Sequence, residues 1–283
     1  ILGMMCLSGT VSAQTTVNYT EFEQKVLDYS QTLKQSVSQR TAMQKAMKAA
    51  KTAFFPAVDA TGSYQYRINK YDMDFGGMAV PMEHDSYSAE VGVVQPIYAG
   101  GSIYHTYKAS QIQSQIADKS VDLTTDNLIY AAEASYWGTA AQKEMYKTMC
   151  QYVEIISQLT KVLQDKYDDG YISKTDLIQM QTRLKEAELQ RSSSYQSYQI
   201  ALQNMNVLMG LEPDKEVGLV DSIFVELPLP AYVGADAALN VRPDYAISQL
   251  DVDYQKRQVK LAAAKYNPSL SIGFKETWGT QML

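Results

Sequence analysis

The sequence predicts a mainly α-helical fold with long antiparallel coiled-coil helices and a β-hairpin of long strands. Three observations support this fold class. Apolar residues follow a heptad pattern on both sides of a turn at 166–175, apolar and polar residues alternate strictly in parts of 57–98, and an Ala-rich helix that runs into a proline and a strand occurs twice. Heptads are typical of helices packed along a seam, and a period of two is typical of strands with one apolar face.

A long helical hairpin is predicted over 102–209. Before the turn its seam consists of Met145, Met149, Tyr152, Ile156, Leu159 and Leu163. After the turn its seam consists of Leu177, Met180, Leu184, Ala187, Arg191, Ser194, Tyr198, Ala201, Met205 and Leu208. Gly170 follows two aspartates and is expected to end the first helix in the left-handed conformation. The chain then turns back, so the two helices are expected to pack antiparallel.

The first helix of this hairpin, 102–167, would be roughly 100 Å long at 1.5 Å per residue. The mean helix of a globular protein has about 11–12 residues. A seam one residue wide cannot bury such a helix, so partners are expected along its length, in an elongated oligomer. An isolated coiled-coil spacer is the alternative at this point.

The segment before the hairpin is predicted to contain one helix and two long strands. The helix covers 19–53 and ends before Pro56. Strict alternation marks a strand at 58–69 and a second strand from residue 87, with a polar loop at 70–86 between them. These strands are about twice the usual 5–6 residues and carry aromatic residues toward their ends, which favours a membrane setting over a soluble sandwich. Pro96 lacks an amide N–H and is expected to leave the ladder.

Composition and the N-terminal residues limit the class of function. Residues 1–13 resemble the end of a secretory signal peptide, with cleavage expected after Ala13. The following sequence has no run of 18 or more apolar residues, so no helical membrane span is predicted. The formal net charge is −6 without a cluster of Lys and Arg, which argues against nucleic acid as a partner.

The helix-to-strand junction is duplicated. Residues 48–58 align with 260–270, and Pro56 and Pro268 take equivalent places at an offset of 212 residues. The sequence therefore divides into a signal peptide remnant at 1–13, a first repeat at 14–235 and the start of a second repeat at 236–283. The first repeat holds a helix, a β-hairpin at 57–98, the helical hairpin and a connector at 210–235. The second repeat is expected to continue past residue 283, and the sequence to be truncated at both ends.

Two segments carry a resemblance to a known family. One is the strand-to-helix junction at 95–101, QPIYAGG, and the other is the hairpin tip at 166–177, KYDDGYISKTDL. With the duplicated junction, their order resembles that of the TolC-like outer membrane efflux proteins, the outer-membrane components of tripartite efflux and type I secretion systems. The resemblance covers nearly all of 17–283 and implies a TolC-like α-barrel and β-barrel with an incomplete second repeat.

The resemblance also implies function and partners. It implies an outer-membrane channel-tunnel subunit for efflux or type I secretion, a passive homotrimeric conduit with strands in outer-membrane lipid and helices extending into the periplasm. A periplasmic adaptor (membrane fusion) protein would join it to an inner-membrane pump. Carried onto this sequence, the adaptor contact falls on the hairpin tip, at Gly170, Tyr171, Ile172, Ser173, Thr175 and Asp176. The junction residues are Gln95, Pro96, Gly100 and Gly101 between strand and helix, and Pro56 and Pro268 between helix and strand.

No pattern predicts an enzyme, a cofactor or a metal site. The sequence has no phosphate-binding glycine loop, no GxGxxG and no ordered set of Ser, His and Asp. His84 and His105 lack metal partners at a recognisable spacing. The alternative function is a periplasmic coiled-coil adaptor or spacer with a small soluble β domain, and strand length distinguishes the two because such a domain has short strands.

Overall fold

The structure is a computed structural model that describes residues 15–66, 68, 72–74, 79–81, 85–224, 231–232 and 234–279. The chain divides into two compact units. Unit 1 comprises Ile1–Gln35 and Asp122–Ala237, and unit 2 comprises Ser36–Val121 and Ala238–Leu283. The signal peptide remnant predicted at 1–13 and His84 lie outside the described residues.

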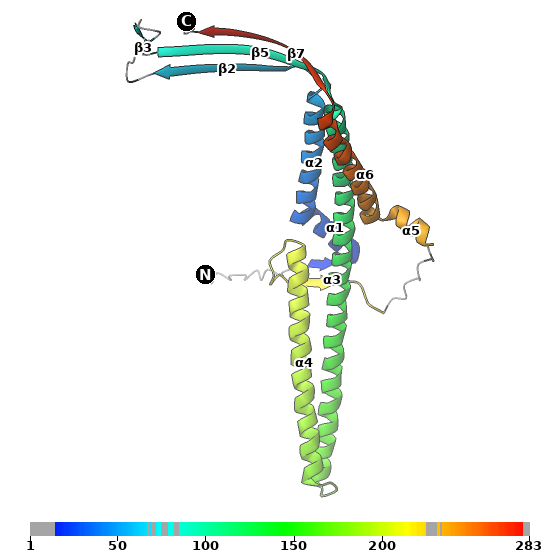
Figure 1. The fold of residues 1–283 in the computed structure, drawn as a ribbon. Helices are drawn as coiled ribbons and strands as arrows, with labels where there is room; N and C mark the ends of the chain where they lie inside the picture. The colour runs from blue at the N-terminus through cyan, green and yellow to red at the C-terminus, as the bar shows by residue number, and fades with distance from the viewer. Residues whose placement is uncertain are drawn as a thin grey trace, which may run out of the picture. The chain divides into compact units, whose positions relative to one another are not determined.

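Two helices form the hairpin of unit 1. They are α3 at Ser102–Asp168, whose beginning belongs to unit 2, and α4 at Lys174–Leu208. Gly170 has a φ of 80°, and the amides of Gly170 and Tyr171 donate to the carbonyls of Tyr167 and Lys166. This is a Schellman motif, in which a left-handed glycine closes a helix. The turn therefore forms as predicted, and α4 runs back along α3 (Figure 1).

Burial confirms the predicted seam in α4 and corrects it in α3. All of the predicted α4 positions are buried or half-buried. The α3 positions that are half-buried as predicted are Met149, Ile156 and Leu163. The α3 positions that are exposed, against the prediction, are Met145, Tyr152 and Leu159. Val153, only 7% exposed, and Thr160 lie in the seam instead. The prediction was wrong because α3 is apolar on two neighbouring stripes, and spacing alone does not show which stripe faces α4.

The core of unit 1 lies around two short strands. β1 at Thr15–Val17 pairs in parallel with β6 at Val217–Leu219. The buried apolar residues are Val17, Phe22, Val26, Ala132, Tyr136, Ala140, Leu202, Met205, Met209, Val217 and Leu219. They come from both strands, from α3 and α4, and from α1 at Tyr19–Tyr29. Neither strand is predictable from the sequence, since three residues are too few to show a period.

The helix predicted at 19–53 is in fact two helices, because α1 ends at Tyr29 and α2 occupies Gln31–Thr52. Ser30 has a ψ of 117°, outside the helical range, and its hydroxyl accepts a hydrogen bond from the Leu33 amide at 3.2 Å. A serine that accepts from the third residue after it is an N-cap, so Ser30 starts a new helix. Likewise α5 at Ala235–Val241 and α6 at Pro243–Ala263 are separate helices, with Pro243 in the first turn of α6.

Unit 2 contains a three-stranded antiparallel sheet in the order β2–β5–β7 (Figure 1). The strands are β2 at Ala57–Tyr66, β5 at Asp85–Ala99 and β7 at Ser269–Gly279. A one-turn 3-10 helix, Ala264–Tyr266, precedes β7. Within the loop predicted at 70–86, β3 at Asp72–Asp74 pairs with β4 at Ala79–Pro81. Both strands of the predicted hairpin are present, and β7 pairs with the other edge of β5.

Pro96 does not leave the sheet, contrary to the prediction. The β2 ladder ends at Val94, but β5 continues along β7, where Pro96 lies opposite Ser271 and Ala99 opposite Ser269. An irregularity between Pro96 and Tyr98 interrupts the register. A proline is tolerated where one side of its strand has no partner or where the ladder bulges, and both conditions hold here.

Direct pairing gathers the apolar side chains on one face of the sheet. Val93 lies between Val58 of β2 and Phe274 of β7, and directly opposed residues share a face. Val58 is 71% exposed and Phe274 68% exposed, so this face is uncovered in the described chain. The opposite face is polar, with an ion pair of 2.7 Å between Lys275 and Glu90. The predicted alternation therefore holds over most of the sheet, with exceptions such as Glu276 of β7, which lies on the apolar face opposite Val91, and Val94, which lies on the polar face.

Candidate functional site

The hairpin tip is held by a capping box at the start of α4. The Ser173 hydroxyl accepts a hydrogen bond from the Asp176 amide at 3.3 Å and donates one to the Asp176 carboxylate at 2.7 Å. That carboxylate also accepts a hydrogen bond from the Ser173 amide at 3.3 Å. Reciprocal capping satisfies donors that a helix N-terminus otherwise leaves free. Ser173 and Asp176 thus fix the conformation of the turn, whatever else they contact.

The structure brings the six tip residues together in one turn and exposes them unequally. Tyr171 is 79% exposed, whereas Ile172 is half-buried. Gly170, Ser173, Thr175 and Asp176 are exposed. The arrangement offers a protruding aromatic ring beside short polar side chains, and aromatic residues are enriched in protein–protein interfaces.

The strand-to-helix junction of unit 2 is fixed by backbone hydrogen bonds from two amide side chains. The Gln95 Nε2 donates to the carbonyl of Phe54 at 3.2 Å, which ties the end of β5 to the residues that follow α2. The Asn267 Nδ2 donates to the Gly100 carbonyl at 3.0 Å. The structure therefore joins Gln95 to the segment that precedes β2 and Gly100 to the segment that precedes β7. Pro96 lies opposite Ser271 within the sheet, and Gly101 lies nearest to His105.

Gly100 occupies a place that admits no side chain. Its φ is 62°, and a Cβ atom there would lie 2.5 Å from the Ala264 carbonyl oxygen and 3.0 Å from the Asn267 Cβ. Gly101 is also left-handed, with a φ of 88°, but its nearest neighbour, His105, is 3.6 Å from such an atom. Gly100 is therefore required by both conformation and space.

Pro56 and Pro268 stand at equivalent places in unit 2. Pro56 lies between the end of α2 and the first residue of β2, and Pro268 lies between the 3-10 helix after α6 and the first residue of β7. A proline in either place prevents the helix from running on and starts an extended segment.

A buried polar cluster in unit 1 was not foreseen from the sequence. The Tyr136 hydroxyl lies 2.7 Å from the Asp221 carboxylate and 3.1 Å from the Val17 carbonyl. The Tyr19 amide donates to the same carboxylate at 2.7 Å. The cluster fastens the end of β6 to β1 and α3. The available signals were a lone aspartate after Val217–Leu219 and an aromatic residue in α3, neither of which is specific.

We expect Tyr136→Phe to destabilise unit 1 by about 2 kcal/mol, because the half-buried Asp221 carboxylate loses the hydrogen bond from the buried Tyr136 hydroxyl. Burial, followed by the hydrogen bond to Asp221, raises the pKa of Tyr136. The folded pKa is above the unfolded value of 10.0, so this stabilisation is full below pH 10 and is lost as the pH rises through the folded value. Denaturant unfolding at pH 8 and at alkaline pH measures both effects.

Tyr130→Phe is the matched control, since Tyr130 is 75% exposed. It should leave the free energy of unfolding unchanged. Equal losses for the two substitutions would contradict the role given to the Tyr136 hydroxyl.

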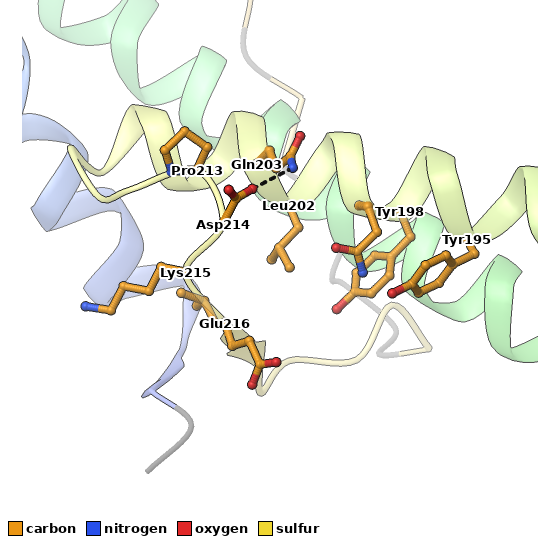
Figure 2. Close-up of a pocket in the computed structure, with 10 residues that line it drawn as sticks. Tyr195, Tyr198, Leu202, Gln203, Pro213, Asp214, Lys215 and Glu216 are labelled. Atoms are coloured by element: carbon orange, nitrogen blue, oxygen red, sulfur yellow. Dashed lines mark hydrogen bonds between the residues drawn. The ribbon is translucent and has the colours of Figure 1, made fainter. Parts of the chain in front are cut away.

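An open pocket of about 330 Å³ lies in unit 1 between the C-terminal half of α4 and the segment 213–217. Figure 2 shows the Tyr195 and Tyr198 hydroxyls pointing into it and the Gln203 amide bonded to Asp214 at 3.0 Å. Its lining residues include neither His nor Cys. The pocket therefore offers hydrogen-bonding groups and aromatic surface.

Within the described ranges, no group of three or more His, Cys, Asp or Glu side chains is placed to hold a metal ion. None of the helices described is both long and apolar enough to cross a membrane.

The fold and its junctions define a class of protein in which a long helical hairpin is joined directly to a long-stranded sheet. The chain belongs to the outer membrane efflux protein family, whose model matches residues 23–211. No curated protein matches the sequence significantly.

Solved structures share the fold at low sequence identity. The Campylobacter jejuni CmeC outer membrane channel matches with a TM-score of 0.77 and 14% identity, over 94% of this chain and 61% of that one. CusC matches with a TM-score of 0.78 and 12% identity, over 95% of this chain and 62% of that one. The outer membrane protein VceC of Vibrio cholerae matches with a TM-score of 0.73 and 13% identity, over 94% of this chain and 68% of that one. The chain thus has a TolC-like fold and spans less than two thirds of the length of CmeC or CusC.

Proposed function

We propose that the chain is a subunit of an outer-membrane channel for efflux or type I secretion. It acts as a passive conduit, is shared by three copies, and meets a periplasmic adaptor that leads to an inner-membrane pump. Family membership supports the class, and the uncovered apolar face of the β2–β5–β7 sheet carries the proposal. An apolar face on strands of 10 to 15 residues matches the hydrocarbon core, which strands of about 9–11 residues cross.

The sheet also supports assembly of several copies. Three paired strands leave two edges, and an open edge in lipid leaves backbone groups unpaired. Strands from other copies would satisfy those groups. A subunit that inserts such strands must therefore pool them with its neighbours.

The helices support the same conclusion independently. An exposed apolar stripe on α3 runs beside the seam that packs on α4, and it consists of Met145, Tyr152, Ile155, Leu159 and Val162. These side chains are 42–62% exposed. A second copy packing on this stripe would bury them, as expected of a wall built from several hairpins.

We further propose that the unit of the fold is a repeat. The transitions α2–Pro56–β2 and α6–Pro268–β7 have the same order and an offset of 212 residues. Residues 14–235 then form the first repeat, and 236–283 begin the second.

The alternative is a periplasmic adaptor or spacer with a small soluble sheet. Such a sheet buries its apolar face on a core of its own, whereas Val58 and Phe274 are mostly exposed here. Cell fractionation distinguishes the two functions. Recovery of the protein in the outer-membrane fraction supports the channel, and recovery in the soluble periplasm supports the spacer.

Tyr171→Ala tests the proposed adaptor contact. An exposed tyrosine at the centre of an interface is worth about 2 kcal/mol or more, so adaptor binding should weaken roughly 30-fold. Stability should not change, because the ring is 79% exposed. The measurement is the amount of adaptor cross-linked to the channel in intact cells.

Tyr130→Ala is the control for this experiment. Tyr130 is 75% exposed and lies in α3 outside the tip, so its removal should leave the cross-linked adaptor at the wild-type level. If Tyr171→Ala also retained the wild-type level, the tip would not be the contact.

A further inference from the structure

A basic cleft lies in unit 2 between the beginning of α3 and α6. Its volume is about 610 Å³, and the cations that line it are Lys108, Lys256, Arg257 and Lys260. A single carboxylate, Asp253, faces them. The whole chain has a formal charge of −6, so the cleft has the opposite sign to the protein. Such a local excess of positive charge attracts anions.

Two of these cations are free to bind an external anion. Asp253 is occupied by Lys256 at 2.9 Å, and the Lys108 ammonium donates to the Gln111 Oε1 at 3.1 Å. Across the residues that the structure describes, Arg257 and Lys260 have no acidic partner. Arg257 is also half-buried, and a guanidinium fork is suited to two oxygens of one phosphate.

The side chain of His105, which begins the same stretch of α3, is affected by the same charges. Burial lowers the pKa of His105, and the positive charges of Arg257 and Lys260 lower it further. Its Nδ1 is buried without a hydrogen-bond partner. His105 therefore lies within the electrostatic field of both cations.

A separate apolar pocket lies in unit 2 one turn of α3 before the cleft. It has a volume of about 380 Å³ at the end of β5 and the start of α3, where Ile97, Tyr98, Ile103 and Tyr104 line it. Tyr104 and Lys108 are four residues apart in α3, so they share a face and lie about 6 Å apart along the axis. A basic cleft next to an apolar pocket suits a molecule with an anionic head and an apolar tail.

We propose that this cleft binds the phosphate headgroup of an anionic lipid, with Arg257 and Lys260 as the phosphate ligands and the apolar pocket receiving the adjoining acyl chains. The inference rests on the proposed function in one respect, namely that β7 lies in the outer membrane. Lys260 is in the last turn of α6, close to the start of that strand. A bound lipid would anchor the helices at the membrane surface.

Native mass spectrometry of the full-length protein in detergent tests the proposal. The probes are phosphatidylglycerol, phosphatidylcholine with the same acyl chains, and sn-glycerol 3-phosphate. The wild type should bind phosphatidylglycerol in preference to phosphatidylcholine. The double variant R257Q/K260Q should bind phosphatidylglycerol roughly 25-fold more weakly, since each cation near an anionic surface contributes about a factor of five.

Matched variants separate the cleft from net charge and from folding. K161Q/R183Q removes the same charge from exposed positions of α3 and α4 and should bind like the wild type. If R257Q/K260Q fails to fold, K108Q is the substitute test, because Lys108 lies on the opposite wall of the cleft. K108Q should also weaken phosphatidylglycerol binding. R257K/K260R keeps both charges and should retain binding.

The outcomes distinguish this inference from the proposed function. Wild-type affinity of R257Q/K260Q for phosphatidylglycerol, or equal binding of both lipids by the wild type, would overturn the site. Equally tight binding of glycerol phosphate would identify a soluble phosphate as the ligand and overturn the lipid. Recovery of the protein in the soluble periplasm would reject the proposed function. The lipid-bound species in the native mass spectra of the purified protein would still show whether the cleft binds phosphatidylglycerol.

Discussion

Replacing Ala60 by Arg is expected to prevent assembly of the protein in the outer membrane. Ala60 lies on the apolar face of β2, opposite Val91 of β5. An arginine on the lipid-facing side of a membrane strand costs about 2–4 kcal/mol near the bilayer midplane, and each copy in the assembly would carry this cost. The measurement is the amount of oligomer recovered from the outer-membrane fraction.

Thr61→Arg is the matched control, because it introduces the same residue one position further along the same strand. Thr61 lies on the polar face opposite Glu90, so an arginine there meets a carboxylate rather than lipid. Assembly should be close to that of the wild type. If Ala60→Arg assembled normally, or if both variants failed alike, the assignment of the two faces would be wrong.

Gly100→Ala should destabilise unit 2 by about 2–5 kcal/mol. The left-handed conformation of Gly100 costs a residue with a Cβ about 1–2 kcal/mol, and overpacking costs about 1–3 kcal/mol more. The clash is with the Ala264 carbonyl oxygen, which belongs to the backbone and cannot rotate away. The change in the free energy of unfolding measures this loss.

Gly170→Ala separates the two causes. Gly170 has a φ of 80°, but a Cβ atom there would have nothing within 4 Å. Its replacement should therefore cost only the conformational strain of about 1–2 kcal/mol. A loss at Gly100 no larger than that at Gly170 would show that the close approach to Ala264 is unimportant.

The strands of the sheet and the seam of α4 were predictable from the sequence because the spacing of their apolar residues matches the buried or shared positions. In β2 and β5 the period of two determines which residues share a face, whatever strand lies alongside. In α4 the weak positions of the seam, Arg191 and Ser194, are half-buried as predicted. The heptad spacing therefore predicted burial correctly in α4, although Leu189 and Ile200 outside the seam are exposed.

The α3 seam was predictable only in part. Tyr152 and Val153 are adjacent and both apolar, as are Ile155 and Ile156, so two stripes satisfy the same spacing. Val153 packs toward the hairpin while Tyr152 is 43% exposed. Which of the two stripes is buried depends on how α3 packs on α4, and the spacing of apolar residues within α3 alone does not show this.

The sites were likewise predictable only where the residue type alone determines the local conformation. Gly100, Gly170 and the prolines are local signals, and their conformations follow from residue type. The pairing of Asp221 with Tyr136 joins residues 85 positions apart, and the basic cleft joins α3 to α6. Contacts between such distant residues require the fold itself.

The oligomeric state and location of the full-length protein test the central claim most directly. The claim is that strands with an uncovered apolar face and helices with an uncovered apolar stripe are completed by further copies of the chain. Native mass measurement of protein extracted from outer membranes should give a homotrimer. A monomer that stays in solution without detergent would contradict the account.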